Sequence, residues 1–168
     1  MKLFNENQIS QLSLQKTDIN KRSYELRAND ETYASFEFNE ENSICEMVTA
    51  RNKYQILKKG IWRPFIIMNS EDNASNLRIN ITPGIANALV DGHFYQFKNI
   101  NFWKNHWAWV NGNNHPLIKY NPIIAGSTKG EIFISDELKY NQNLETICCI
   151  GCYLLIAFDI DEELNPTK

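Results

Sequence analysis

The sequence lacks the long apolar stretch that a membrane-spanning helix requires. Its longest uncharged apolar run, TICCIGCYLLIAF at positions 146–158, has thirteen residues, whereas a helix that crosses a bilayer needs about 20. The first sixteen residues, MKLFNENQISQLSLQK, also lack the uninterrupted apolar core of an export signal. We therefore expect no transmembrane span and no secretion, and predict a cytoplasmic protein with reduced thiols.

An excess of positive charge is also missing. The chain has 17 Lys and Arg against 20 Asp and Glu, a net charge of −3, whereas nucleic-acid-binding proteins usually carry a strongly basic surface. There is no glycine-rich phosphate-binding motif and no nucleophile motif, and the three histidines share no catalytic spacing. These absences argue against a nucleic-acid partner, a nucleotide cofactor and an enzyme, and leave a hydrolase or transferase using His106 or His93 as a weaker alternative.

Cysteine is scarce, and its placement does not favour a metal site. Cys149 and Cys152 have the spacing of half a zinc site, but no second pair follows them. Cys148 and this pair lie among isoleucines and leucines, and Cys45 lies in a strand-like segment. Because a free cysteine packs as a small hydrophobe, we expect four inert core thiols and neither a metal nor a cofactor.

Short strand patterns are abundant. From Arg22 to about residue 135, ten or eleven segments rich in aromatic and β-branched residues alternate with turn signals. Asp91-Gly92 predicts a two-residue hairpin with a type I′ turn, because both positions of that turn need positive φ. Asn111-Gly112, followed by two further asparagines, predicts a longer loop. This many short strands predict a barrel or a sandwich.

The apolar run near the C-terminus selects between these two architectures. A helix over about 144–158 would be apolar on every face, so it would have to be enclosed. The natural enclosure is a closed sheet, and we predict a mainly β protein, an antiparallel barrel around a buried C-terminal helix. Residues 1–21 are expected to form an extension packed on the barrel as a helix or an extra strand. The barrel domain spans 22–160, and 161–168 form an acidic tail.

An internal similarity supports a repeated strand–turn–strand unit. YQILKKGIWRPFIIM (54–68) aligns without gaps to YQFKNINFWKNHWAW (95–109) at an offset of 41 residues. Tyr, Gln and Trp are identical at three aligned positions, and three further pairs are of similar type. Repeats of this kind usually build architecture.

The segment VDGHFYQFKNINFWKNHWAWVNGNNHPLIKY (90–120), followed by KGEIFIS (129–135) and ETICCIGCYLLIAF, resembles the tubby C-terminal-like superfamily, which includes phospholipid scramblases and LURP-one-related proteins. The similarity extends over about residues 22–159 and is closest in type to small bacterial members. It implies a barrel of about twelve strands around a hydrophobic helix. It also implies membrane association, since tubby proteins bind phosphoinositide head groups through surface Lys and Arg.

The strongest candidate binding residues lie in one predicted turn. Lys58, Lys59 and Arg63 surround Trp62, and such a turn could hold a phosphate or lipid head group with the tryptophan in the membrane interface. The alternative is a sheet edge protected by lysines. Lys104 lies in a second aromatic and basic segment. Strand alternation there predicts one core-facing or rim-facing side, formed by Trp103, Trp107 and Trp109.

Two hypotheses for function remain. The first is a non-enzymatic binding or scaffold module that associates peripherally with membranes or anionic lipids. The second is a protein–protein interaction module, homo-oligomeric or partner-binding, without a lipid role. The sequence specifies neither the ligand nor the oligomeric state.

Overall fold

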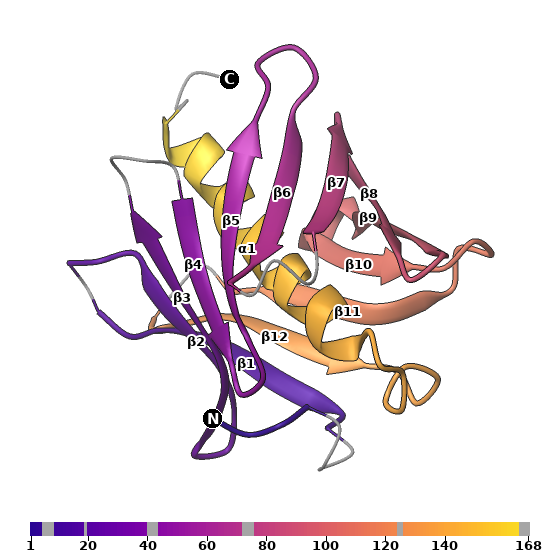
Figure 1. Cartoon of the computed structure of the whole chain (residues 1–168). Helices are drawn as coiled ribbons and strands as arrows, with labels where there is room; N and C mark the ends of the chain where they lie inside the picture. Colours follow the sequence, from indigo (N-terminus) through magenta and orange to yellow (C-terminus); the bar gives the residue numbers. More distant parts are fainter. Residues whose placement is uncertain (5–8, 19, 40–43, 72–75, 124–125, 165–168) are drawn as a thin grey trace.

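The fold is a closed ring of twelve antiparallel strands in which each strand pairs with its neighbours in the chain (Figure 1). It was obtained as a computed structural model and describes residues 1–4, 9–18, 20–39, 44–71, 76–123 and 126–164, with side chains up to residue 157. The strands are β1 (Gln11–Lys16), β2 (Ser23–Ala28), β3 (Glu31–Asn39), β4 (Ile44–Thr49), β5 (Lys53–Lys59), β6 (Phe65–Ser70), β7 (Asn76–Thr82), β8 (Ile85–Val90), β9 (His93–Asn101), β10 (His106–Val110), β11 (Pro116–Pro122) and β12 (Thr128–Ile134).

The ring is closed by a strand from the expected N-terminal extension. Residues 11–16 form β1, which pairs with β2 on one side and with β12 on the other. Leu12 and Leu14 are buried and alternate with partly or fully exposed polar residues. This period-2 pattern places one face of β1 in the core, so the extension is an integral part of the barrel.

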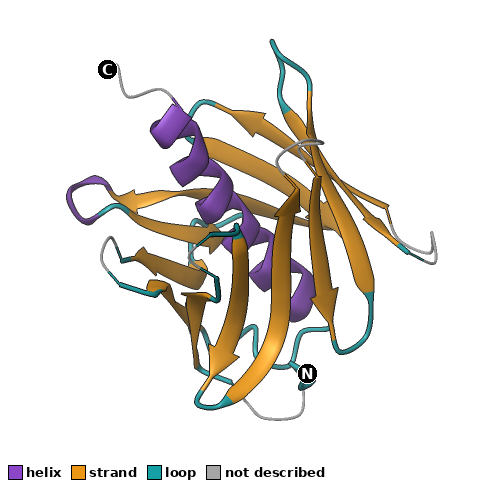
Figure 2. Ribbon diagram, turned by 90° about the vertical axis from the view of Figure 1, so that its left-hand side faces the viewer, coloured by secondary structure: helices purple, strands orange, loops and turns teal. Residues whose placement is uncertain are grey.

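The single α-helix, α1 (Leu144–Leu164), runs through the interior of the barrel (Figures 1 and 2). Side chains 144–156 are buried with the exception of Thr146, which is partly exposed. The prediction of a closed β-barrel around a hydrophobic C-terminal helix is therefore confirmed. No helix in the described part of the chain is long and apolar enough to cross a membrane.

The helix approaches the wall most closely at Gly151. A Cβ atom at this position would overlap the hydroxyl group of Tyr120 on β11 and would lie 2.9 Å from Nε1 of Trp109 on β10. Tyr120 donates its hydroxyl proton to the carbonyl oxygen of Cys148, 3.1 Å away. The absence of a side chain at Gly151 therefore lets the wall and the helix pack in direct contact.

The turns follow the chemistry of their residues. Val90 pairs with His93, and both residues between them have positive φ, 48° for Asp91 and 77° for Gly92, as a type I′ turn requires. The loop after β10 is longer, because the N–H of Asn111 bonds to the carbonyl of His115. Both hairpin predictions are confirmed.

Candidate functional site

Two hairpins of the barrel end in large apolar side chains that face solvent. The first rim tip, Ile61–Arg63, joins β5 to β6, and the second rim tip, Phe102–Lys104, is a short 3₁₀ turn (η1) between β9 and β10. The exposed fractions are 93% for Ile61, 95% for Trp62, 83% for Phe102 and 93% for Trp103. Large apolar side chains this exposed have no role in the core, so they are available for a contact with something outside the molecule.

Both tips lie at the same end of the barrel. In an antiparallel ring whose strands follow chain order, every turn after an odd-numbered strand is at one end, and β5–β6 and β9–β10 are two such turns. The helix enters beside the opposite end, where Thr49 at the end of β4 bonds to Glu145. Its C-terminal end therefore emerges at the end that carries the tips, as Figures 1 and 2 show.

The tips correspond to the internal sequence similarity. Tyr54 and Tyr95 are both buried, the residues two positions later are both buried, and Trp62 and Trp103 are both exposed. Each tip has the order large apolar residue, tryptophan, cation, which reads Ile61-Trp62-Arg63 and Phe102-Trp103-Lys104. The repeated unit thus places the same surface motif twice on one end of the barrel.

Asparagine side chains hold the second tip in one conformation. Oδ1 of Asn101 accepts a hydrogen bond from the N–H of Lys104 at 3.2 Å, which caps the 3₁₀ turn. Asn105 ends the turn in the left-handed region with φ 51°, and its Oδ1 accepts bonds from Asn99 at 3.3 Å and from Nε1 of Trp107 at 2.9 Å. Because its backbone is fixed, little conformational entropy is lost when this tip makes a contact.

The predicted basic residues lie at or beside the tips. Lys58 and Lys59 are exposed at the end of β5, Arg63 is exposed at the first tip and Lys104 is exposed at the second. Beside the first tip, the guanidinium group of Arg78 lies 4.0 Å from the ring centre of Phe65. The structure therefore brings Lys58, Lys59, Trp62 and Arg63 together on one hairpin, while Lys104 belongs to a second hairpin at the same end.

The charge of the chain is divided between two sides of the barrel. Residues 51–127, which span β5 to β11, contain nine Lys and Arg and three Asp and Glu, a net charge of +6. The rest of the chain contains eight Lys and Arg and seventeen Asp and Glu, a net charge of −9. Since β5 to β11 are consecutive in the ring, the total of −3 conceals a basic side that includes both tips.

The expected alternation of the tryptophans is wrong for Trp103. Trp103 is 93% exposed, Trp107 is partly buried and Trp109 is fully buried. The 3₁₀ turn at residues 102–104 interrupts the strand, and the register of β10 shifts on both its edges, between His106 and Trp107 and between Trp109 and Val110. Trp107 and Trp109 lie between the two shifts, keep the period of two and both contact the ring of Phe97, so Trp103 alone leaves the core-facing side.

The cysteines have the environment expected of core residues. Cys45, Cys148, Cys149 and Cys152 are free and buried. Burial raises the pKa of Cys45, and it raises the pKa values of Cys149 and Cys152 well above their usual range. Among the described residues, no group of three or more His, Cys, Asp and Glu side chains is arranged to hold a metal ion.

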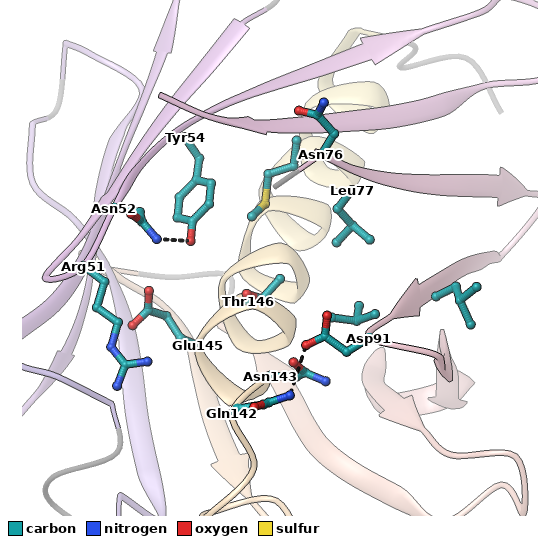
Figure 3. Close-up of a pocket in the computed structure, with 13 residues that line it drawn as sticks. Arg51, Asn52, Tyr54, Asn76, Leu77, Asp91, Gln142, Asn143, Glu145 and Thr146 are labelled. Atoms are coloured by element: carbon teal, nitrogen blue, oxygen red, sulfur yellow. Dashed lines mark hydrogen bonds between the residues drawn. The ribbon is translucent and has the colours of Figure 1, made fainter. Parts of the chain in front are cut away.

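A cavity of about 400 Å³ lies at the opposite end of the barrel from the tips (Figure 3). It is formed by the first turn of α1, the segment before it and the adjoining ends of β5, β6, β7 and β8. The lining residues are Arg51, Asn52, Tyr54, Met68, Asn76, Leu77, Leu89, Val90, Asp91, Gln142, Asn143, Glu145 and Thr146. None is a histidine, and the cavity could not be predicted from the sequence because its residues come from separate segments.

Comparison with known proteins adds no functional assignment: no family model, no curated protein and no solved structure matches this chain.

Proposed function

We propose that the protein is a peripheral membrane-binding module that docks onto anionic lipid surfaces through its two rim tips. The observation that carries this proposal is the repetition of an exposed apolar residue, tryptophan and cation on two hairpins at one barrel end. Tryptophan favours the membrane interface, where its ring is partly in hydrocarbon and its N–H remains hydrated. Lys and Arg beside it are attracted to anionic head groups.

The distribution of charge supports this orientation. The tips belong to the side of net charge +6, and a basic surface accumulates at a negatively charged membrane within about a Debye length. The acidic strands on the other side of the ring would be repelled from the same surface, while the acidic end of α1, which emerges beside the tips, opposes part of this attraction. Electrostatic attraction thus brings the tips to the lipid, and the apolar side chains then enter the interface.

The resemblance to the tubby C-terminal-like superfamily agrees with this proposal. A twelve-stranded barrel around a hydrophobic helix is the architecture that this resemblance implies, and scramblases and tubby proteins in that group act at membranes. We therefore propose a scramblase-like or tubby-like relative of bacterial type that acts without catalysis at the cytoplasmic face of a membrane.

The proposal is tested by co-sedimentation with vesicles of phosphatidylcholine alone and with 30 mol% phosphatidylserine, roughly the anionic content that raises the surface potential. We expect binding only to the anionic vesicles. Replacing Lys58, Lys59 and Arg63 by alanine should weaken it about 100-fold, because each cation contributes about 1 kcal/mol. Replacing Trp62 and Trp103 by alanine should weaken it by about 2 kcal/mol per residue.

Two matched variants serve as controls. Tyr140 is 74% exposed but lies between β12 and α1, at the other end of the barrel, and Lys119 is an exposed cation on the wall strand β11. Tyr140→Ala and Lys119→Ala should bind vesicles like the unmodified protein. Absence of binding to anionic vesicles, or equal losses in the control variants, would contradict the proposal. Loss of a stable oligomer in the Trp62 and Trp103 variants would instead favour the protein–protein alternative.

A further inference from the structure

The cavity at the helix N-terminus combines an apolar floor with a polar rim that has spare hydrogen-bonding capacity. Tyr54, Met68 and Val90 are buried in its floor, and amides, carboxylates and one hydroxyl line the side formed by α1 and the turns. Its volume of about 400 Å³ falls within the range of small-molecule sites, about 300–1,000 Å³. The size and the mixture of surfaces suit a small amphiphilic molecule.

One buried polar side chain in the rim has no partner among the described residues. Asn143 is only 4% exposed; its backbone groups bond to Asn141 and Ile147, but none of the hydrogen bonds observed within the described part of the chain involves its side-chain amide. Figure 3 shows this amide among the residues around the cavity, near Asp91. This amide is not one of the fully enclosed polar groups that lack a partner, so it is open to the cavity and can hydrogen-bond a bound molecule with a complementary polar group.

The charged groups of the rim indicate which sign of charge that molecule carries. Glu145 is 7% exposed, and while its Oε1 accepts a bond from Thr49 at 2.8 Å, Oε2 makes no hydrogen bond or ion pair with any described residue. Asp91 adds a second carboxylate, which accepts a bond from Gln142 at 3.3 Å. Arg51 is exposed at the outer edge, and Figure 3 shows its guanidinium group on the side of Glu145 away from Asp91.

An anion would be poorly accommodated despite the nearby helix N-terminus. The positive end of the helix dipole favours negative charge, but Glu145, in the first turn of α1, already supplies that charge. A divalent metal ion is also disfavoured, since the described residues form no group of three acidic, histidine or cysteine ligands. An organic cation can donate to Asp91 and to the side-chain carbonyl oxygen of Asn143, gain from the negative charge of Glu145 and place its hydrocarbon part on the apolar floor.

We infer that this cavity is a binding site for a small organic cation of the alkylamine class. The ammonium group is held by Asp91 and Asn143, Glu145 adds negative charge on the other side of the first turn of α1, and the alkyl chain packs on Met68 and Val90. The Tyr54 ring offers a further cation–π contact. The site lies at the opposite end of the barrel from the tips, so it does not depend on the proposed membrane contact.

The inference is tested by titrating the full-length protein with butylammonium chloride and following backbone amide shifts by NMR. Butanol and sodium butyrate serve as matched neutral and anionic probes. We expect saturable shifts at residues 52–54, 90–92 and 142–146 with butylammonium, weaker shifts with butanol and none with butyrate. Absence of saturable shifts up to high millimolar concentration, which would mean that the cavity holds only water, would overturn the inference, as would equal or stronger binding of butyrate.

Three variants and one control test whether the bound molecule is a cation. Asp91→Asn keeps a residue suited to the type I′ turn and should weaken butylammonium binding about tenfold, the effect of one lost charge-assisted hydrogen bond. Glu145→Gln should weaken it by a smaller factor, because this carboxylate acts from a greater distance, and Arg51→Ala should strengthen it or leave it unchanged. Asp30→Asn, in the β2–β3 turn at the same barrel end, is the control and should have no effect. Weaker binding in Arg51→Ala with unchanged binding in Asp91→Asn would contradict the cation assignment.

Discussion

Gly151 determines how closely the helix can approach the barrel wall. In an isolated helix, Gly151→Ala would be favourable by about 1 kcal/mol because alanine is the better helix former. Here the new Cβ overlaps the hydroxyl of Tyr120, which is fully buried and bonded to the helix backbone. Overpacking of this kind costs about 1–3 kcal/mol or more, so the steric cost exceeds the gain.

We therefore expect Gly151→Ala to lower the free energy of unfolding by about 2 kcal/mol, measured by urea denaturation. Gly112→Ala is the matched control, because a Cβ there meets no atom within 4 Å. It should leave the urea midpoint unchanged. An unchanged midpoint for Gly151→Ala would show that the helix and β11 can separate without loss of stability.

A second prediction at the residue scale concerns the chemical reactivity of the buried thiols. Since burial raises the pKa of Cys45, Cys149 and Cys152, they stay neutral and protected in the folded protein at pH 8. An aromatic disulfide reagent should label none of the four cysteines in native protein and all four in guanidinium chloride. Rapid labelling of one thiol in the native state would contradict this picture of the core.

The raised pKa values of these thiols also determine whether the stability of the fold rises or falls with pH. Below pH about 8.5 the thiols are protonated in both states and contribute no pH dependence. Above it they ionise only in the unfolded chain, so stability falls as pH rises, by about 1.4 kcal/mol per thiol per pH unit. Urea midpoints between pH 8 and 10 should show this decline, with a shallower slope in Cys45→Ala. A slope unchanged by this substitution would assign the decline to other groups.

At the scale of the element, the second rim tip is an example of a preorganised contact surface. Asn105→Gly keeps the left-handed backbone but removes the bonds that Oδ1 accepts from Asn99 and Trp107. We expect lower NMR order parameters at residues 102–104 and severalfold weaker vesicle binding, because the loosened tip loses more entropy on contact. Asn29→Gly, at another left-handed asparagine (φ 53°) in the β2–β3 turn, should change neither quantity. Equal vesicle affinity in Asn105→Gly would mean that tip rigidity is irrelevant to binding.

The elements also show what the sequence could and could not predict. The helix was predictable because an apolar run of thirteen residues with no polar face must be enclosed, and most strands because period-2 patterns recur between turn residues. The strand β1 was ambiguous, since QLSLQK has only two apolar residues to mark its buried face. The exposed position of Trp103 could not be read from the sequence, because a 3₁₀ turn and the register shift between His106 and Trp107 interrupt the alternation.

At the scale of the whole molecule, the two candidate sites divide the barrel into ends with different roles. The tips and the emerging helix mark one end, while the cavity and the turns beside the helix N-terminus mark the other. The cavity could not have been predicted, since its lining residues lie between positions 51 and 146 and only closure of the ring brings them together. A barrel docked by its tips would keep the cavity open to water.

This arrangement predicts a fixed orientation on the membrane. Because the four native cysteines are buried, a single exposed cysteine can carry a nitroxide label. Thr82→Cys places the label in the β7–β8 turn at the tip end, and Asp30→Cys places it at the opposite end. With anionic vesicles, we expect the label at position 82 to become more accessible to oxygen and less accessible to a water-soluble nickel complex, while the label at position 30 stays in water. In about 1 M salt, where the Debye length falls to about 3 Å, both labels should report water. The reverse pattern, or equal changes at the two positions, would show that the barrel does not dock by its tips.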